Sequence, residues 1–131
     1  MKKVGLVGGI GPESTISYYH DIVYGVQKRV GRDFFPDMSI ESIDLFKWVE
    51  LCDQKRYDEL VDFTLAPIQR LAASGADFAV LTANTAHLIF DQVQARSPIP
   101  LISIVEATAQ EAARRGYKKV GLLGTGFTMK N

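Results

Sequence analysis

The feature that most constrains the fold is a short apolar run that ends at glycine and leads directly into a helix. Residues 4–7, "VGLV", are followed by Gly8-Gly9, and such a run is typical of a strand buried on both faces. Pro12 and Glu13 then begin a helix, because proline is tolerated in a first turn and a carboxylate suits the positive end of the helix dipole. Strand, glycine turn and helix together form the repeating unit of parallel α/β proteins.

The same alternation continues along the chain. Residues 38–43 alternate apolar and polar side chains and predict a second strand, whereas residues 57–73 repeat apolar side chains at helical spacing and predict a helix. Further strands are predicted at residues 78–81, in an extended segment from residue 98, and at residues 120–123, with another helix over residues 105–115. Alternating strands and helices imply right-handed crossovers and a parallel sheet. We therefore expect a three-layer α/β lobe.

Composition and charge exclude several classes of function. Among 131 residues, 15 Lys and Arg balance 15 Asp and Glu, so the chain has no excess of positive charge for binding nucleic acid. No apolar run approaches the roughly 20 residues that cross a bilayer, and the run after Met1-Lys2-Lys3 is too short for a signal peptide. The single cysteine, Cys52, cannot form an internal disulfide, which favours a reducing cytoplasm. We expect a cytoplasmic protein with a small-molecule partner and neither nucleic acid nor membrane.

One segment of the chain returns near its end. Residues 2–11 read "KKVGLVGGIG" and residues 118–127 read "KKVGLLGTGF". We interpret this as a duplicated α/β architecture, with residues 1–116 as the N-terminal lobe and residues 117–131 as the opening strand and turn of a second, truncated lobe. The alternative is that parallel β–turn–α units look alike, because buried strands draw on few residue types.

The predicted turns at residues 8–11, 82–85 and 124–125 all follow strands, so we expect them at the carboxyl edge of the sheet, where ligands of such folds bind. The first turn lacks the G-x-G-x-x-G spacing of dinucleotide-binding loops, and Pro12 removes one backbone donor. The N–H groups of Gly9, Ile10 and Gly11 suit a smaller anion such as a carboxylate. The alternative is a tight turn that needs glycine for its dihedral angles alone.

The stretch "LTANTAH", residues 81–87, carries the richest polar cluster. Asn84 and Thr85 bring an amide and a hydroxyl to the end of a buried strand, which suits a carboxylate or an oxyanion. The alternative role is a helix N-cap, for which Asn and Thr are common. We interpret His87 as a hydrogen-bonded residue that orients this turn. Because His20 and His87 have no metal-ligand spacing, no metal site is predicted.

The stretch "VELCDQKRYDE" looks like a polar connection. Cys52 lies within it, and a lone cysteine without a neighbouring base is not expected to be reactive. Just before it, Phe46 and Trp48 either cover the edge of the sheet or form part of a lid.

Four segments together resemble the aspartate/glutamate racemase family: "VGLVGGIGPESTISYY", "TANTAHLIFDQVQ", "IPLISIVEAT" and "KKVGLLGTGFTM". They occur in the family's order and cover essentially the whole chain. The resemblance implies two pseudo-symmetric α/β lobes with the active site between them, no cofactor or metal, and a homodimer. It also implies two cysteines, one per lobe, on opposite sides of the amino-acid Cα. One removes the Cα proton as a thiolate and the other returns it.

The resemblance also assigns roles to residues. Asn84, Thr85 and Thr125 would bind the carboxylate and amino groups of the substrate, and the turn at residues 9–11 would form another wall. The first-lobe cysteine would immediately precede Asn84, but Ala83 stands there, and a methyl group cannot transfer a proton. The second-lobe cysteine would fall beyond Asn131, and Cys52 matches neither position.

Three explanations for Ala83 stay open: the chain is part of a longer protein with one cysteine in its second lobe, the parent has diverged, or Ala83 is an engineered replacement. The leading hypothesis is a racemase-family protein for aspartate or glutamate that works by cofactor-independent Cα proton transfer and is inactive as this chain alone. The first alternative is a non-catalytic amino-acid or carboxylate-binding protein. A further alternative is an isolated oligomerisation lobe.

Overall fold

The computed structural model describes residues 1–130, and in this part of the chain four parallel strands form one sheet in the order β2-β1-β3-β4. The strands are β1 (Val4–Gly8), β2 (Met38–Ser42), β3 (Phe78–Leu81) and β4 (Leu101–Ile102). In the register, Gly8 pairs with Ser42 and Val7 pairs with Leu81. The carboxyl ends of the three longer strands therefore meet at one edge, and the predicted parallel α/β fold is confirmed.

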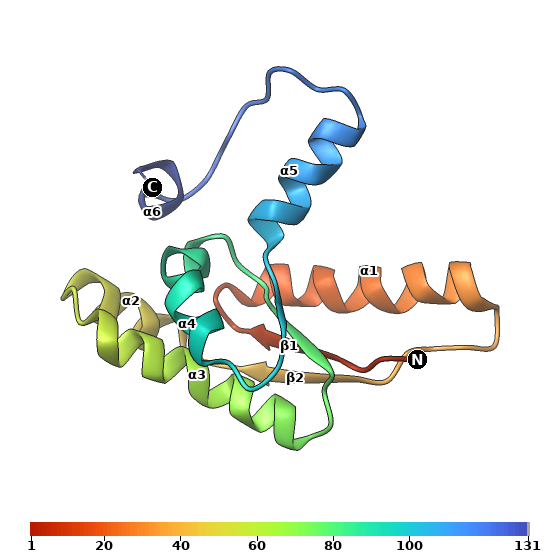
Figure 1. Ribbon diagram of the computed structural model, residues 1–131, viewed down its shortest axis with the longest axis horizontal. Coiled ribbons are helices and arrows are strands. Elements are labelled where there is room, and N and C mark those ends of the chain that lie inside the picture. The colour runs from red at the N-terminus through yellow and green to blue at the C-terminus, as the bar shows by residue number, and fades with distance from the viewer. Residues whose placement is uncertain (131) are drawn as a thin grey trace.

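Helices cover the two faces of this sheet (Figure 1). Helix α1 (Pro12–Val30) lies on one face, and α2 (Leu45–Asp53), α3 (Tyr57–Ala73) and α4 (Phe90–Arg96) lie on the other. A short 3₁₀ helix, η1 (Thr85–Ile89), leads from β3 into α4. Helix α5 (Ile104–Arg114) and the short α6 (Gly126–Lys130) stand away from the sheet, and neither has a buried residue. The predicted three-layer arrangement is confirmed.

Alternate residues of β1 pack on opposite faces of the sheet. Val7 joins a large core cluster that includes Trp48 and Leu60, whereas Leu6 joins a smaller cluster against Tyr18 of α1. Leu6 and Val7 are both completely buried. A strand buried on both faces reads as a continuous apolar run, which explains why residues 4–7 show no polar alternation.

Two glycines at the end of β1, the strand's last residue and the one after it, are required by the close approach of other parts of the chain. Gly9 has φ +89°, and a Cβ there would lie 2.3 Å from the carbonyl oxygen of Ile43. At Gly8 a Cβ would lie 2.4 Å from the side chain of Thr15. These positions therefore need glycine for the turn itself, whether or not the turn also binds an anion.

The interpretation of residues around Cys52 as a polar connection is wrong, because they form α2. Asp44 begins this helix: its side chain accepts hydrogen bonds from the N–H groups of Phe46 (2.8 Å) and Lys47 (3.4 Å). Trp48 is fully buried and donates its indole N–H to Thr64 Oγ1 at 3.3 Å, so it forms neither a lid nor an edge cover. Phe46, in contrast, is 83% exposed. Cys52 is buried, and burial raises the pKa of its thiol, with the nearby Asp53 carboxylate adding to the rise.

The strand predicted at residues 120–123 is absent from the structure. These residues adopt no regular structure, and Leu123 is 94% exposed. A strand needs a neighbour for its backbone N–H and C=O groups, and no strand pairs with this segment in the described part of the chain. The assignment of residues 117–131 to a second lobe stays a prediction, and Asn131 lies outside the described residues.

Within residues 1–130, no helix has the length and apolar character needed to span a membrane.

Candidate functional site at the carboxyl edge of the sheet

Hydrogen bonds from hydroxyl groups connect the turn after β1 and the start of α1 to the end of β3. Ser14 Oγ donates to the carbonyl oxygens of Gly11 (2.9 Å) and Thr82 (2.8 Å). Thr15 Oγ1 accepts from the N–H of Gly9 at 3.0 Å and lies 3.1 Å from Thr82 Oγ1. The sequence analysis assigned no role to Ser14 or Thr15, and it placed Thr82 in the turn at residues 82–85 without giving its hydroxyl a role. The available signal was their position directly beside the predicted glycine turn and strand end.

Asn84 and Thr85 follow immediately, at the start of η1. Asn84 already has helical dihedral angles (φ −61°, ψ −42°), and its side chain makes no capping hydrogen bond. Its backbone carbonyl accepts from the N–H of His87 at 2.9 Å, while its side chain is exposed. The side chain of Asn84 therefore does not act as a helix cap, and its amide makes no hydrogen bond to η1.

Thr125 reaches this cluster from the far end of the chain. Its Oγ1 lies 3.1 Å from Thr85 Oγ1, and it accepts a long hydrogen bond of 3.4 Å from the N–H of Thr128 in α6. The structure thus brings together Asn84, Thr85 and Thr125, the three residues that the resemblance assigned to substrate binding. Their roles in binding stay predictions.

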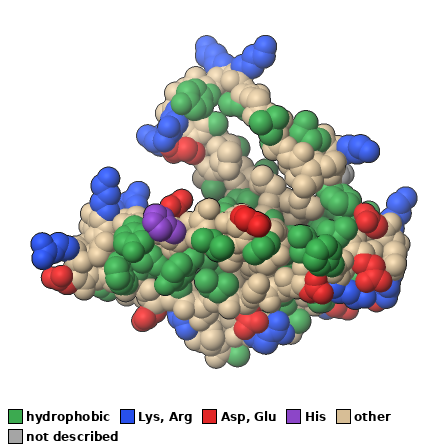
Figure 2. All heavy atoms as spheres, turned by 180° about the vertical axis from the view of Figure 1, so that it is seen from behind, with side chains coloured by type: hydrophobic (Ala, Val, Ile, Leu, Met, Phe, Trp, Pro, Cys, Tyr) green, Lys and Arg blue, Asp and Glu red, His purple; other side chains and the backbone are tan. Residues whose placement is uncertain are grey.

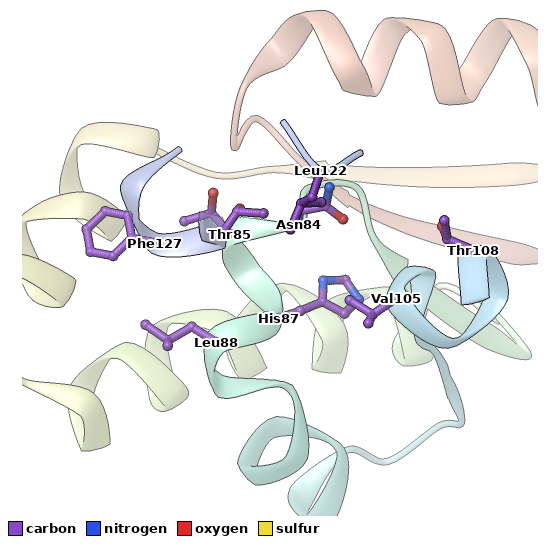
Figure 3. Close-up of a pocket in the computed structure, with 9 residues that line it drawn as sticks. Asn84, Thr85, His87, Leu88, Val105, Thr108, Leu122 and Phe127 are labelled. Carbon is purple, nitrogen blue, oxygen red and sulfur yellow. The ribbon is translucent and has the colours of Figure 1, made fainter. Parts of the chain in front are cut away.

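A pocket of about 380 Å³ opens beside these residues (Figure 3). Such a volume suits a small-molecule ligand. η1, α5, α6 and the segment before α6 supply its lining, which consists of Asn84, Thr85, His87, Leu88, Val105, Thr108, Leu122, Phe127 and Thr128. The polar groups of the lining come from the start of η1, from Thr108 on α5 and from Thr128 on α6, and they share the pocket with apolar side chains. The predicted wall at Gly9 and Ile10 does not line it, and Ile10 is buried in the core.

His87 connects the turn to α5. Its Nδ1 lies 2.9 Å from the carbonyl oxygen of Ala83, and its Nε2 accepts from the N–H of Ile104 at 3.2 Å. Its ring stacks on Phe90 with the centroids 5.0 Å apart and the planes 4° from parallel. Burial lowers the pKa of His87, although the hydrogen bond to Ala83 opposes this effect. The hydrogen bond from the N–H of Ile104 and the burial both favour a neutral imidazole.

Ala83 lies between Thr82 and Asn84 and is partly buried against the core. Its carbonyl oxygen is hydrogen-bonded to His87 Nδ1, and its methyl group carries no exchangeable proton. The position implied for the first cysteine therefore offers no acid or base. Cys52 does not supply one either, because it is a residue of α2 buried in the core cluster and is not part of the pocket lining. Within the described residues, no group of three or more His, Cys, Asp or Glu side chains gathers that could hold a metal ion.

A parallel sheet with an amide, several hydroxyls and a small pocket at its carboxyl edge defines the class of α/β proteins that bind small ligands beyond their strand ends. Within this class the chain belongs to the Asp/Glu/hydantoin racemase family, whose sequence profile matches residues 7–131. The resemblance drawn from the four sequence segments is thereby confirmed.

Individual relatives agree with the family. A broad specificity amino-acid racemase, RacX, from Bacillus subtilis (strain 168) is 28% identical over 98% of this chain. A crystal structure of a Yersinia pestis protein provisionally assigned as an Asp/Glu racemase is 32% identical over the full chain, with a TM-score of 0.91. An aspartate racemase homologue from Pyrococcus horikoshii OT3 is 32% identical over 88% of the chain, with a TM-score of 0.77. The chain spans 56%, 57% and 50% of these three proteins, which is about half their length and consistent with one lobe.

Proposed function

We propose that the chain forms the substrate-binding half of a cofactor-independent racemase for acidic amino acids. The observation that carries this proposal is the unengaged Asn84 amide and the Thr85 hydroxyl at one pocket, with Thr125 Oγ1, which is not part of the pocket lining, 3.1 Å from Thr85 Oγ1. Two hydroxyls and an amide can donate to a carboxylate and accept from an ammonium group, which are the two groups that every α-amino acid presents. Family membership supports the same ligand class.

The chemistry of racemisation defines what this half supplies and what it lacks. A Cα proton beside a carboxylate is weakly acidic, so the enzyme needs donors for the charge that develops and a base poised to take the proton. Asn84 and Thr85 supply donors. Ala83 supplies no base, so proton transfer by the complete protein requires groups outside this chain. We expect no racemase activity from these 131 residues alone.

The proposal also includes a homodimer in a reducing, cytoplasmic setting. Figure 2 shows hydrophobic side chains gathered along the outer face of α1. Ile16 is 68% exposed, and Tyr19 and Tyr24 are each 51% exposed. Exposed apolar surface of this kind is typical of an interface. Sedimentation of the complete protein with and without Tyr19→Glu tests the dimer, which we expect the substitution to weaken.

Solvent exchange at Cα tests the racemase proposal directly. In D₂O, we expect the complete protein to incorporate deuterium into L- or D-aspartate or glutamate, whereas this chain alone binds the amino acid without exchange. Ala83→Cys in the complete protein should raise exchange if a partner cysteine is present on the other side of Cα. Absence of exchange with all four amino acids, despite binding, would contradict the racemase proposal.

The second candidate is a non-catalytic amino-acid or carboxylate-binding protein, and the observation that favours it is Ala83. It predicts binding by the complete protein and no Cα exchange, whether position 83 is Ala or Cys. The exchange experiment therefore separates the two candidates.

A further inference from the structure

The wall of the pocket opposite η1 is α5, whose first residue, Ile104, packs partly buried against the core cluster of Val4, Leu6 and Val80. None of its residues is buried, although Val105 and Thr108 line the pocket. Two side chains accept hydrogen bonds from backbone N–H groups of its first turn: Ser103 Oγ accepts from the N–H of Glu106 at 3.2 Å, and His87 Nε2 accepts from the N–H of Ile104. Only the second of these bonds ties α5 to the turn that carries Asn84 and Thr85.

The two partners of His87 specify where its proton lies. The carbonyl oxygen of Ala83 can only accept a hydrogen bond, so Nδ1 must carry a hydrogen. The backbone N–H of Ile104 can only donate, so Nε2 must keep its lone pair. Only the neutral Nδ1–H tautomer satisfies both contacts. A doubly protonated ring keeps the bond to Ala83 but places an N–H against the N–H of Ile104.

We propose that His87, as the neutral Nδ1–H tautomer, is a positioning residue that fixes α5 against the Asn84–Thr85 turn, and that protonation of its ring releases the first turn of α5 and widens the pocket. The proposal about α5 rests on hydrogen-bond geometry alone. Its consequence for amino-acid affinity rests on the proposed function.

The surroundings of the ring offer little to stabilise a positive charge. Burial lowers the pKa of His87, the bond to Ala83 opposes this effect, and no carboxylate contributes. The charged side chains on the neighbouring helices are Asp91 and Arg96 on α4, Glu106, Glu111 and Arg114 on α5, and Lys130 on α6. Glu111 is paired with Arg114 and Arg115, and the other four residues are exposed. The ring also faces the N-terminal end of α5, where the helix dipole disfavours a cation.

Nuclear magnetic resonance of the ¹⁵N-labelled 131-residue chain tests the proposal without a ligand. We expect the His87 ring nitrogens to show the Nδ1–H tautomer at neutral pH. On acidification, the amide of Ile104 should shift with the same midpoint as the His87 ring. Its protection factor, which corrects the exchange rate for the slower intrinsic exchange at lower pH, should fall about five- to tenfold, as for the loss of one hydrogen bond. His20 is exposed and bonded to Asp21 rather than to a backbone N–H, so its ring resonances provide an internal control for the tautomer assignment.

Two substitutions separate the bonds that His87 makes. The amide of Asn reaches roughly the place of Nδ1 and the amide of Gln that of Nε2, so H87N keeps a donor for Ala83 and H87Q keeps an acceptor for Ile104. We expect H87N to expose the Ile104 amide at all pH values and H87Q to protect it without pH dependence. H20Q should leave the wild-type titration intact.

Two results would overturn the proposal: an Nε2–H tautomer at neutral pH, or a protection factor of the Ile104 amide that does not change as His87 is protonated. Aspartate binding, measured by calorimetry above and below the midpoint, forms a separate arm, in which affinity should fall on acidification. If aspartate does not bind at any pH, the proposed function fails while the resonance experiment still decides the role of His87.

Discussion

Thr15 Oγ1 and Thr82 Oγ1 lie 3.1 Å apart, although 67 residues separate them in the sequence. This contact joins the first turn of α1 to the end of β3. Thr82 Oγ1 also donates to the carbonyl oxygen of Val7 at 3.1 Å, and Thr82 is 1% exposed. A buried chain of hydroxyls therefore sets the spacing of the two turns at the carboxyl edge of the sheet.

Replacing Thr82 with valine removes this hydroxyl while keeping the side-chain shape. We expect Thr82→Val to lower the free energy of unfolding by about 1–2 kcal/mol, because buried partners lose a hydrogen bond. Urea denaturation measures the change. Thr108→Val, at an exposed position on α5, should cost less than about 0.5 kcal/mol. Equal costs for the two variants would contradict the structural role assigned to Thr82.

The close approach at Gly9 predicts a severe effect of alanine. Gly9→Ala combines φ +89° with a Cβ only 2.3 Å from the backbone oxygen of Ile43, so we expect a loss of about 3 kcal/mol or more. Gly75 is the matched control, because its φ is +85° and a Cβ at that position would have no neighbouring atom within 4 Å. Gly75→Ala should cost only about 1 kcal/mol. Similar thermal denaturation midpoints for the two variants would contradict this reasoning.

The burial of Trp48 in α2 predicts sensitivity to a conservative change. Trp48→Phe leaves Thr64 without the indole N–H and opens space in the core, and we expect it to cost about 1–3 kcal/mol. Phe46→Leu, two residues earlier on the exposed face of the same helix, should change stability by less than about 0.5 kcal/mol. Guanidinium denaturation of both variants checks the assignment of α2 to the core.

The lowered pKa of His87 predicts a pH dependence of stability with a defined sign. In the window between the lowered folded-state pKa of His87 and the unfolded value of about 6.5, the unfolded chain binds a proton that the folded chain does not. The contribution is therefore complete above about pH 6.5 and is lost as the pH falls through the folded-state pKa. His87→Gln should flatten this component of a urea stability profile, whereas His20→Gln should retain it. An unchanged profile for His87→Gln would contradict the prediction.

The side chain of Asn84 is exposed and makes no capping hydrogen bond, so we expect its substitution to change ligand binding but not stability. Asn84→Ala should leave the free energy of unfolding within about 0.5 kcal/mol, because no intramolecular bond is lost. It should weaken amino-acid binding about five- to tenfold if the amide contacts the ligand. Calorimetric titration with aspartate measures this, and Gln94→Ala on the exposed side of α4 is the control. A large loss of stability would indicate a structural role instead.

Local sequence pattern was sufficient to predict the parallel α/β architecture and the grouping of its turns. Buried strands leave continuous apolar runs, and a covered helix leaves a 3.6-residue repeat, so residues 4–7 and 57–73 were assigned correctly. Because parallel strands end at the same edge, the order of elements also predicted that the turn at residues 82–85 lies beside the turn at residues 8–11. The contact of Thr125 with Thr85 did not follow from this rule, because the described residues just before Thr125 form no strand.

Features that depend on partners distant in the chain emerged only from the folded structure. The sequence offered an edge cover or a lid for Trp48 and did not reveal that it is a core residue, because burial depends on what packs against it. The apolar run at residues 120–123 has a strand pattern but no neighbouring strand, within residues 1–130, to accept its backbone bonds, so it is irregular. The tautomer of His87 depends on Ala83 and Ile104, whose hydrogen-bonding groups meet the ring only after folding. Local sequence reports the averaged environment of a segment, whereas hydrogen-bond partners are set by three-dimensional contact.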